Sequence, residues 1–233
     1  LVVFLPYITL PFLFLIDFSG MFSNMDPGNP SGVVRAELQI LTSPGYVLLV
    51  VGGWIANTLG AIDFAGGTAV HINAGIAGLA VVLVLGRRLG WPHAPRPHNL
   101  PATVLGAGIL WFGWFGFNGG SALAAGTAAS VVFLNTFAAA CTALLAWLVV
   151  EKFRDGHATT LGAASGLIAG LVAITPSCGA VSPVGALIIG VVAGTVCPFA
   201  IGLKRRFGYD DALDVVGVHL VGGILGTLLI GLL

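Results

Sequence analysis

Long apolar runs separated by short polar stretches dominate the sequence. They predict helices over residues 1–16, 45–62, 67–86, 100–117, 127–150, 158–174, 183–203 and 214–233. Runs of about 20 apolar residues can cross the hydrocarbon of a bilayer as helices, whereas the strands of a transmembrane barrel would alternate apolar and polar positions over about ten residues. We therefore expect an all-α integral membrane protein with several spans.

The composition supports this class and excludes others. Of the 233 residues, 57% are hydrophobic and 8% are charged, against about 25% charged residues in soluble domains. Nine Lys and Arg residues balance nine Asp and Glu residues, so the chain lacks the basic excess of a nucleic-acid-binding protein. Cys141, Cys178 and Cys197 have neither disulfide nor metal-site spacing, and no nucleophile–base pair is recognisable. We expect no enzyme activity, no metal and no cofactor.

The basic residues predict the orientation in the membrane. All of them except Arg35 fall in alternate loops: Arg87, Arg88 and Arg96; then Lys152 and Arg154; then Lys204, Arg205 and Arg206. Basic loops face the cytoplasm in membrane proteins. The helix that carries His71 is then expected to run inward through the cell membrane, and the helix that carries His219 to run outward.

Two segments repeat one pattern. Asp63 precedes His71 as Asp211 precedes His219, with seven residues between the members of each pair, and the similarity continues through VHINAGIAG (70–78) and VHLVGGILG (218–226). The copies are 148 residues apart with four predicted helices between them, so the second copy crosses the membrane in the opposite direction. Such inverted repeats place binding sites near the middle of the membrane.

The two repeated histidines are candidate functional residues. An ionisable side chain inside a membrane helix usually faces a pathway or the interior of the bundle, so His71 and His219 are candidates for a pore lining. The alternative is a pair of buried histidines that bond to neighbouring backbone. His93, His98 and His157 lie in predicted loops, where ordinary solvation explains them.

Several segments together resemble the ammonium transporter family, in its Amt branch. They are GAIDFAGGTAVHINAGIAGL (60–79), PHNLP (97–101), GWFGFNGGS (113–121), LGAASGLIAGLVAITPSCG (161–179), ALIIGVVAG (186–194) and DDALDVVGVHLVGGILG (210–226). The resemblance implies an eleven-helix fold with inverted five-helix repeats, assembled as a homotrimer. Residues 45–233 correspond to about helices four to ten of that fold, whereas residues 1–44 are unmatched. Because the chain starts at Leu1 and stops at Leu233 within an apolar run, we expect it to be a piece of a longer protein.

The resemblance also implies roles for individual residues. His71 and His219 match the twin pore histidines, which coordinate ammonia and relay its proton. Phe117 matches the inner of two stacked phenylalanines that gate the pore.

A second group matches the outer mouth, where ammonium is recruited. Ser121 matches the hydroxyl of the recruiting site, Asp63 the acidic residue beside it, and Trp114 and Thr175 residues that line the entrance. Val51 stands where the family has a tryptophan.

Asp63 and Asp214 also have a structural interpretation. Asp63 is either a cation ligand or an anion that holds the first N–H groups of the His71 helix. Asp214, at the start of the His219 helix, invites the same structural role.

The function that the resemblance implies is transport of ammonium or ammonia through a hydrophobic pore, with loss of a proton before passage. The alternatives are an ammonium sensor on the same scaffold and a fragment that cannot conduct. The resemblance further implies a regulatory protein of the PII type on the cytoplasmic side.

Overall fold

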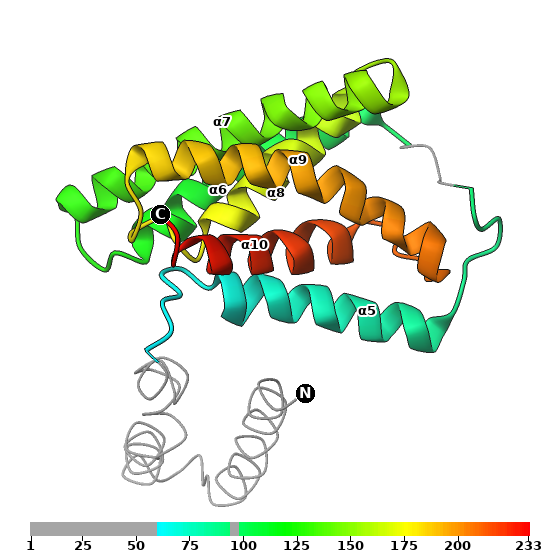
Figure 1. The fold of residues 1–233 in the computed structure, drawn as a ribbon, viewed down its shortest axis with the longest axis horizontal. Coiled ribbons are helices and arrows are strands. Elements are labelled where there is room, and N and C mark those ends of the chain that lie inside the picture. The colour runs from blue at the N-terminus through cyan, green and yellow to red at the C-terminus, as the bar shows by residue number, and fades with distance from the viewer. Residues whose placement is uncertain (1–59, 94–97) are drawn as a thin grey trace, which may run out of the picture. The chain divides into compact units, whose positions relative to one another are not determined.

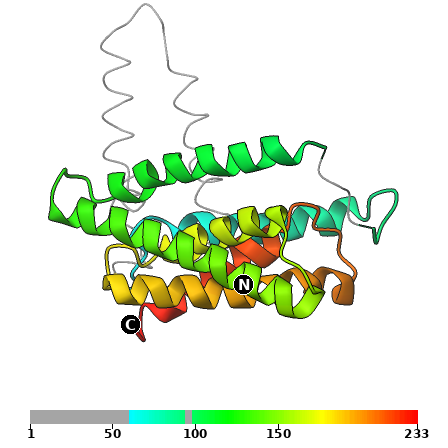
Figure 2. The same ribbon diagram turned by 90° about the horizontal axis from the view of Figure 1, so that it is seen from above.

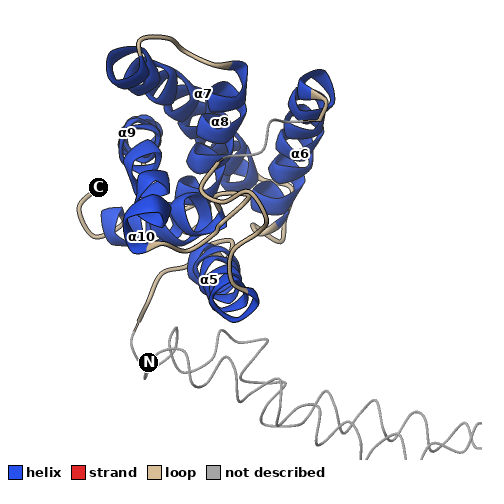
Figure 3. Ribbon diagram, turned by 90° about the vertical axis from the view of Figure 1, so that its right-hand side faces the viewer, coloured by secondary structure: helices blue, strands red, loops and turns tan. Residues whose placement is uncertain are grey.

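The computed structural model describes residues 60–93 and 98–233, and every regular element within them is helical (Figure 3). In chain order these are η1 (Gly67–Ile72), α5 (Asn73–Leu85), α6 (Leu100–Gly120), α7 (Thr127–Asp155), α8 (Thr160–Ile174), α9 (Pro183–Phe207), η2 (Val216–Leu220) and α10 (Val221–Leu229). The predicted helices from residue 67 onward are confirmed within a few residues. The helix predicted at 1–16, the boundary between 44 and 45, and the helix predicted at 45–62 up to residue 59 lie outside the described residues; residues 60–62 are described and are not helical.

Four of these helices can cross a membrane by length and composition. They are the continuous segment Gly67–Leu85, followed by Leu100–Gly120, Thr127–Asp155 and Pro183–Phe207. Thr160–Ile174 and Val216–Leu229 are apolar but shorter. The chain is therefore a multi-pass membrane protein.

Helix α8 lies at the centre of the bundle, because it packs against α6, α7, α9, α10, η1 and η2. Glycines of α8 and α9 let both helices approach the backbone of α7 closely. A Cβ atom added to Gly170 of α8 would lie 2.5 Å from the carbonyl oxygen of Ala139 on α7. Gly190 and Gly194 of α9 press in the same way on the carbonyl oxygens of Ala139 and Ala143. The residues around these contacts are fully buried, as small residues in membrane helix interfaces commonly are. Figure 1 shows α9 running alongside α7.

Helix α6 packs against α7 and α8 and lies at the edge of the bundle (Figure 2). Asn99 caps the N-terminus of α6, because its side-chain oxygen accepts a hydrogen bond from Ala102 N at 3.0 Å. A proline follows in the first turn of the helix. Most of its large apolar side chains are exposed, whereas Trp114 and Asn118 are buried. The buried side of α6 is the side that reaches the histidines.

The two repeats cross as antiparallel neighbours, α5 with η2 and α10 with η1. A Cβ atom on Gly75 would lie 2.5 Å from the backbone nitrogen of Leu220, and one on Gly223 would lie 2.9 Å from Cγ1 of Ile72. Gly75 matches Gly223 in the repeat, and Ile72 matches Leu220. Gly75 of the first repeat contacts Leu220 of the second, and Gly223 of the second contacts Ile72 of the first. Such a reciprocal pair of contacts is what a two-fold axis between the repeats produces.

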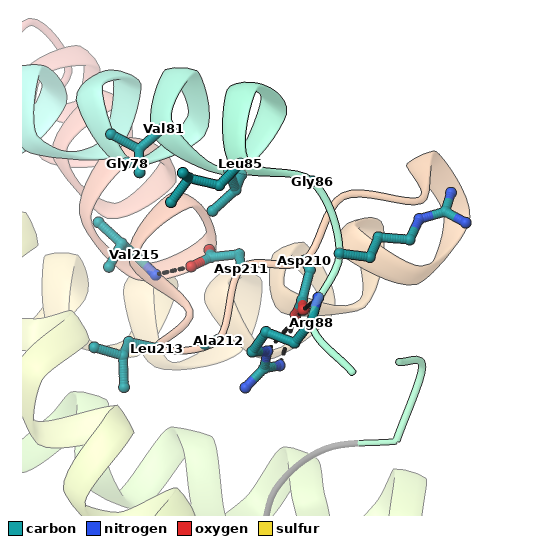
Figure 4. Close-up of a pocket in the computed structure, with 12 residues that line it drawn as sticks. Gly78, Val81, Leu85, Gly86, Arg88, Asp210, Asp211, Ala212, Leu213 and Val215 are labelled. Carbon is teal, nitrogen blue, oxygen red and sulfur yellow. Dashed lines mark hydrogen bonds and ion pairs between the residues drawn. The ribbon is translucent and has the colours of Figure 1, made fainter. Parts of the chain in front are cut away.

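The three basic loops meet at one end of the bundle. Arg88 forms an ion pair with Asp210 at 2.6 Å and donates its backbone N–H to the same carboxylate (Figure 4). Arg87 Nε donates to the carbonyl oxygen of Gly208 at 2.8 Å, and Arg154 Nη1 donates to that of Pro198 at 2.8 Å. The described basic loops therefore share one side, as the sequence predicted.

Candidate functional site

His71 and His219 lie in the two π-helical segments, η1 and η2. π-Helical turns are rare and are frequent at functional sites, because the extra residue per turn changes where a side chain points. The two ring centroids are 5.5 Å apart, with 44° between the ring planes. The repeat therefore brings the two predicted pore histidines together where its two copies cross.

Each π-helical segment is held at its start by an aspartate from the preceding loop. Asp63 Oδ2 accepts hydrogen bonds from Thr68 N and Ala69 N, both at 3.0 Å. Asp63 thus caps the first N–H groups of the His71 segment, which was one of its two predicted roles. The second carboxylate oxygen of Asp63, Oδ1, is buried without a partner among the described residues. The carboxylate is thus placed both to fix the His71 segment and to add negative charge beside it.

In the second repeat the equivalent residue is Asp211, which corrects the prediction for Asp214. Asp211 Oδ1 accepts from Val215 N at 3.0 Å, and Oδ2 accepts from Val216 N at 2.7 Å (Figure 4). Asp214 instead has a left-handed backbone with φ of 59° and forms an ion pair with Lys204. Asp211, four and five residues before these N–H groups, holds both of them, and the carboxylate of Asp214 is engaged by Lys204 instead.

Aromatic side chains from α6 enclose His71. Trp114 stacks on its ring at 5.1 Å between centroids and 21° between planes. Phe117 meets the same ring edge-on at 6.1 Å and 86°, and Trp114 and Phe117 contact each other at 5.6 Å. His71 is consequently 3% exposed.

Each of the two histidines has a ring nitrogen that makes no hydrogen bond within the described part of the chain. His71 Nε2 and His219 Nδ1 are both buried without a hydrogen-bond partner among the described residues. A neutral imidazole nitrogen can donate or accept one hydrogen bond, and an unsatisfied buried one costs free energy. The pair therefore has unused hydrogen-bonding capacity in a water-poor, mostly apolar setting.

Thr175 holds the indole of Trp114, and Asn118 lies beside Thr175. Trp114 Nε1 donates to Thr175 Oγ1 at 3.0 Å, and that hydroxyl donates to the carbonyl oxygen of Leu171 at 2.7 Å. Asn118 Nδ2 donates to Thr136 Oγ1 at 3.1 Å. Thr175 and Asn118 are fully buried, and the hydroxyl of Thr175 positions Trp114; its predicted role at the entrance stays a prediction.

Sequence reasoning did not select Asn118 or Thr136. Asn118 lies within the GWFGFNGGS segment (113–121), directly after Phe117, and a polar amide inside an apolar helix is a signal that could have found it. Thr136 has no such signal, since a threonine in a membrane helix commonly bonds to its own backbone, as this one does to Val132 O at 2.7 Å.

Ser121 lies at the far end of α6 from the basic loops. Its hydroxyl donates to the carbonyl oxygen of Phe117 at 2.9 Å, and its side chain is partly accessible. It therefore lies one helical turn beyond Phe117, at the end of α6 opposite the basic loops that are predicted to face the cytoplasm. Val51 lies outside the described residues.

Comparison with known proteins places the chain in a family. The sequence model of the Ammonium Transporter Family matches residues 37–233. The ammonium transporter of Mycobacterium bovis is 64% identical over 183 residues, which cover 78% of this chain and 38% of that protein. The chain thus spans about two fifths of that relative's length.

Two solved structures have the same fold. The crystal structure of Candida albicans Mep2 superposes with a TM-score of 0.71 and 42% identity, covering 78% of this chain and 41% of that one. A structure described as a sensor Amt protein gives a TM-score of 0.70 and 38% identity, covering 76% of this chain and 45% of that one. With most of its length matched by the family model and by relatives of high identity, the chain belongs to the ammonium transporter family.

Proposed function

We propose that this chain carries the pore histidines of an ammonium transporter, and that ammonium gives up its proton before ammonia passes His71 and His219. The observation that carries the proposal is the pair of adjacent imidazoles, each with a buried nitrogen that has no hydrogen-bond partner among residues 60–93 and 98–233, with Trp114 and Phe117 against His71. The proposal extends the family membership to a mechanism for these residues.

The chemistry follows from the cost of moving a charge into an apolar space. An ion taken out of water without a partner costs many kcal/mol, and this cost falls equally on ammonium and potassium, which have similar size and charge. Ammonium can avoid the cost by losing a proton, whereas potassium cannot. A passage lined by apolar and aromatic groups therefore selects the ion that can become neutral.

The histidines supply what the neutral molecule and the proton then need. The free nitrogens of His71 and His219 can exchange hydrogen bonds with ammonia, and two adjacent imidazoles can pass a proton between them. Phe117, against the edge of His71, acts in the proposal as the gate above the pair. Ser121 and Asp63, on the same side as Phe117, attract the cation through a hydroxyl acceptor and a negative charge.

We propose a homotrimer, which the family resemblance implies and which crosslinking in the membrane would measure. The end of the bundle where the basic loops meet, at Arg88 and Asp210, is the surface proposed to face a PII-type regulator.

The test is ammonium flux into liposomes that contain the protein expressed from its complete reading frame. His71→Ala and His219→Ala should each either lower ammonium flux by about a hundredfold, the low end of the effect of a positioned proton-transfer group, or make the pore permeable to potassium. His157→Ala is the matched control, since His157 is exposed in a loop and bonds only to Asp155 O. Selective flux that survives both pore substitutions would overturn the mechanism.

A sensor is the second candidate, because a structure described as a sensor Amt protein shares this fold at a TM-score of 0.70. A sensor would bind ammonium without moving it. Saturable ammonium binding by a parent protein that gives no flux in the same liposomes would favour sensing over transport.

A further inference from the structure

A second site lies at the end of the bundle where the basic loops meet, well away from the histidines. A cavity of about 560 Å³ opens there between the last turns of α7, the last turns of α9 and the segment before η2. Its charged lining consists of Arg154, Asp155, Lys204, Arg205 and Asp214, and its apolar lining of Pro198, Phe199, Ile201 and Gly202. The cavity therefore combines charged and apolar lining residues.

The charges of the cavity do not cancel. Arg154 pairs with Asp155 at 2.7 Å, and Lys204 pairs with Asp214. Arg205 has neither a hydrogen bond nor an ion pair with any residue of the described segments, and its side chain is exposed. One positive charge remains available to a ligand, and two further cations stand beside it with N–H groups that their present partners do not all use.

The apolar wall places the cavity at the surface of the hydrocarbon. Phe199 is 56% exposed, and its ring lies 5.8 Å below the guanidinium of Arg154. Val196 and Leu203, on the same helix, are also exposed large apolar residues. Helix α9 then ends in Lys204, Arg205 and Arg206, so its apolar flank gives way to positive charge within one turn, as at a membrane–water boundary.

We propose that this cavity binds the phosphate headgroup of an anionic phospholipid from the leaflet that faces the basic loops. Arg205 would contact the phosphate, with Lys204 and Arg154 beside it, while Phe199 and Ile201 contact the glycerol and the start of the acyl chains. Basic pockets between membrane helices are suited to such headgroups. A free phosphate ion would use the cations alone and would leave the apolar wall unused, which is why the lipid is the assigned source.

The experiment measures lipid binding to the purified protein, expressed from its complete reading frame, in detergent micelles. The probes are phosphatidylglycerol, phosphatidylcholine of the same chain length, and inorganic phosphate, and the readout is the dissociation constant by native mass spectrometry. Phosphatidylglycerol should bind more tightly than phosphatidylcholine. Arg205→Gln should weaken phosphatidylglycerol binding about fivefold, the effect of one basic residue near a lipid surface.

Arg206→Gln is the matched control, because Arg206 is adjacent to Arg205 but does not line the cavity. Arg205→Lys should retain most of the binding, and the elution volume of each variant checks its fold. Equal weakening by Arg205→Gln and Arg206→Gln would overturn the site. Equal binding of the two lipids would overturn the need for an anionic headgroup, and inorganic phosphate that displaces the lipid at equal concentration would overturn the lipid as ligand.

Discussion

The tryptophan that stacks on His71 is itself held by buried neighbours. Trp114 stacks on His71, and the orientation of its ring depends on one hydrogen bond to Thr175. Thr175 in turn takes its orientation from the carbonyl oxygen of Leu171. A change at Thr175 should therefore reach the histidine without touching it.

Thr175→Val should lower ammonium flux while Thr175→Ser retains it. Valine has the same shape but no hydroxyl, so Trp114 Nε1 loses its acceptor, at a cost of about 1–3 kcal/mol for an unsatisfied buried group, and the ring becomes free to tilt away from His71. Flux into liposomes and the midpoint of thermal unfolding measure the two effects. If Thr175→Val matched the parent in both, the positioning role would be wrong.

Substitutions at Asp211 and Asp214 should distinguish the roles of these two aspartates of the second repeat. Asp211→Ala should destabilise the protein by about 0.5–2 kcal/mol, the usual cost of losing a helix cap, because Val215 N and Val216 N lose their acceptor. Asp214→Asn, which tolerates the left-handed backbone and loses only the pair with Lys204, should cost less than about 1 kcal/mol. Thermal unfolding of both variants in one detergent checks the order, and the reverse order would restore Asp214 as the cap.

These residues also show how far sequence reasoning reaches. Both histidines followed from the repeat, and the same spacing already paired Asp211 with Asp63. Asp214 was chosen because it lies nearest to the predicted helix, but its pair with Lys204, which takes its carboxylate away from the helix, forms only once α9 has folded against this segment. The hydrogen bond between Asn118 and Thr136 could not be predicted from the sequence, because it joins α6 to α7 and forms only once these helices pack.

The elements themselves were easier to predict than their local geometry. Apolar runs and Gly or Pro boundaries located the helices from residue 67 onward within a few residues. The π-helical turns at His71 and His219 were not predicted, because over five or six residues an apolar pattern does not distinguish an α-helical turn from a wider one. The last residue of each turn, Ile72 or Leu220, contacts a glycine of the other repeat.

Gly75→Ala should destabilise the crossing strongly. Its new methyl group would lie 2.5 Å from the backbone nitrogen of Leu220, and a backbone cannot move aside as a side chain can, so we expect a loss of about 1–3 kcal/mol or more. Gly108→Ala is the control, because a Cβ atom at Gly108 meets nothing within 4 Å and alanine favours helix formation. Unfolding midpoints that fall equally for both would contradict the close contact.

At the scale of the molecule, one ion pair joins the two repeats at the end with the basic loops. Arg88, which follows α5, binds Asp210, which precedes η2, through its backbone and its guanidinium. The hydrogen bonds from Arg88 lower the pKa of Asp210 below its usual range, whereas burial raises the pKa of Asp214 in the same segment. These opposite shifts allow the two acids to be told apart by pH.

Asp210→Asn should therefore lose stability in a pH-dependent way. Since the pKa of Asp210 is lowered by folding, its contribution is complete above the unfolded pKa of about 3.9 and is lost as the pH falls through the lower folded value. The parent should exceed Asp210→Asn in unfolding midpoint by a constant amount from about pH 5 to pH 8, and the gap should close in more acidic solution. A gap that widened in acid would have the wrong sign for this pair.

The reciprocal contact of Gly75 with Leu220 and of Gly223 with Ile72 has a consequence for the proposed transport. Transporters that expose one site alternately to each side rock one repeat against the other. Here the two repeats touch with no clearance for a methyl group at the level of the histidines, so such rocking would have to break the crossing at every turnover. We expect the contact between the two repeats to stay intact while only side chains such as Phe117 move. The transport kinetics should then resemble those of a gated channel.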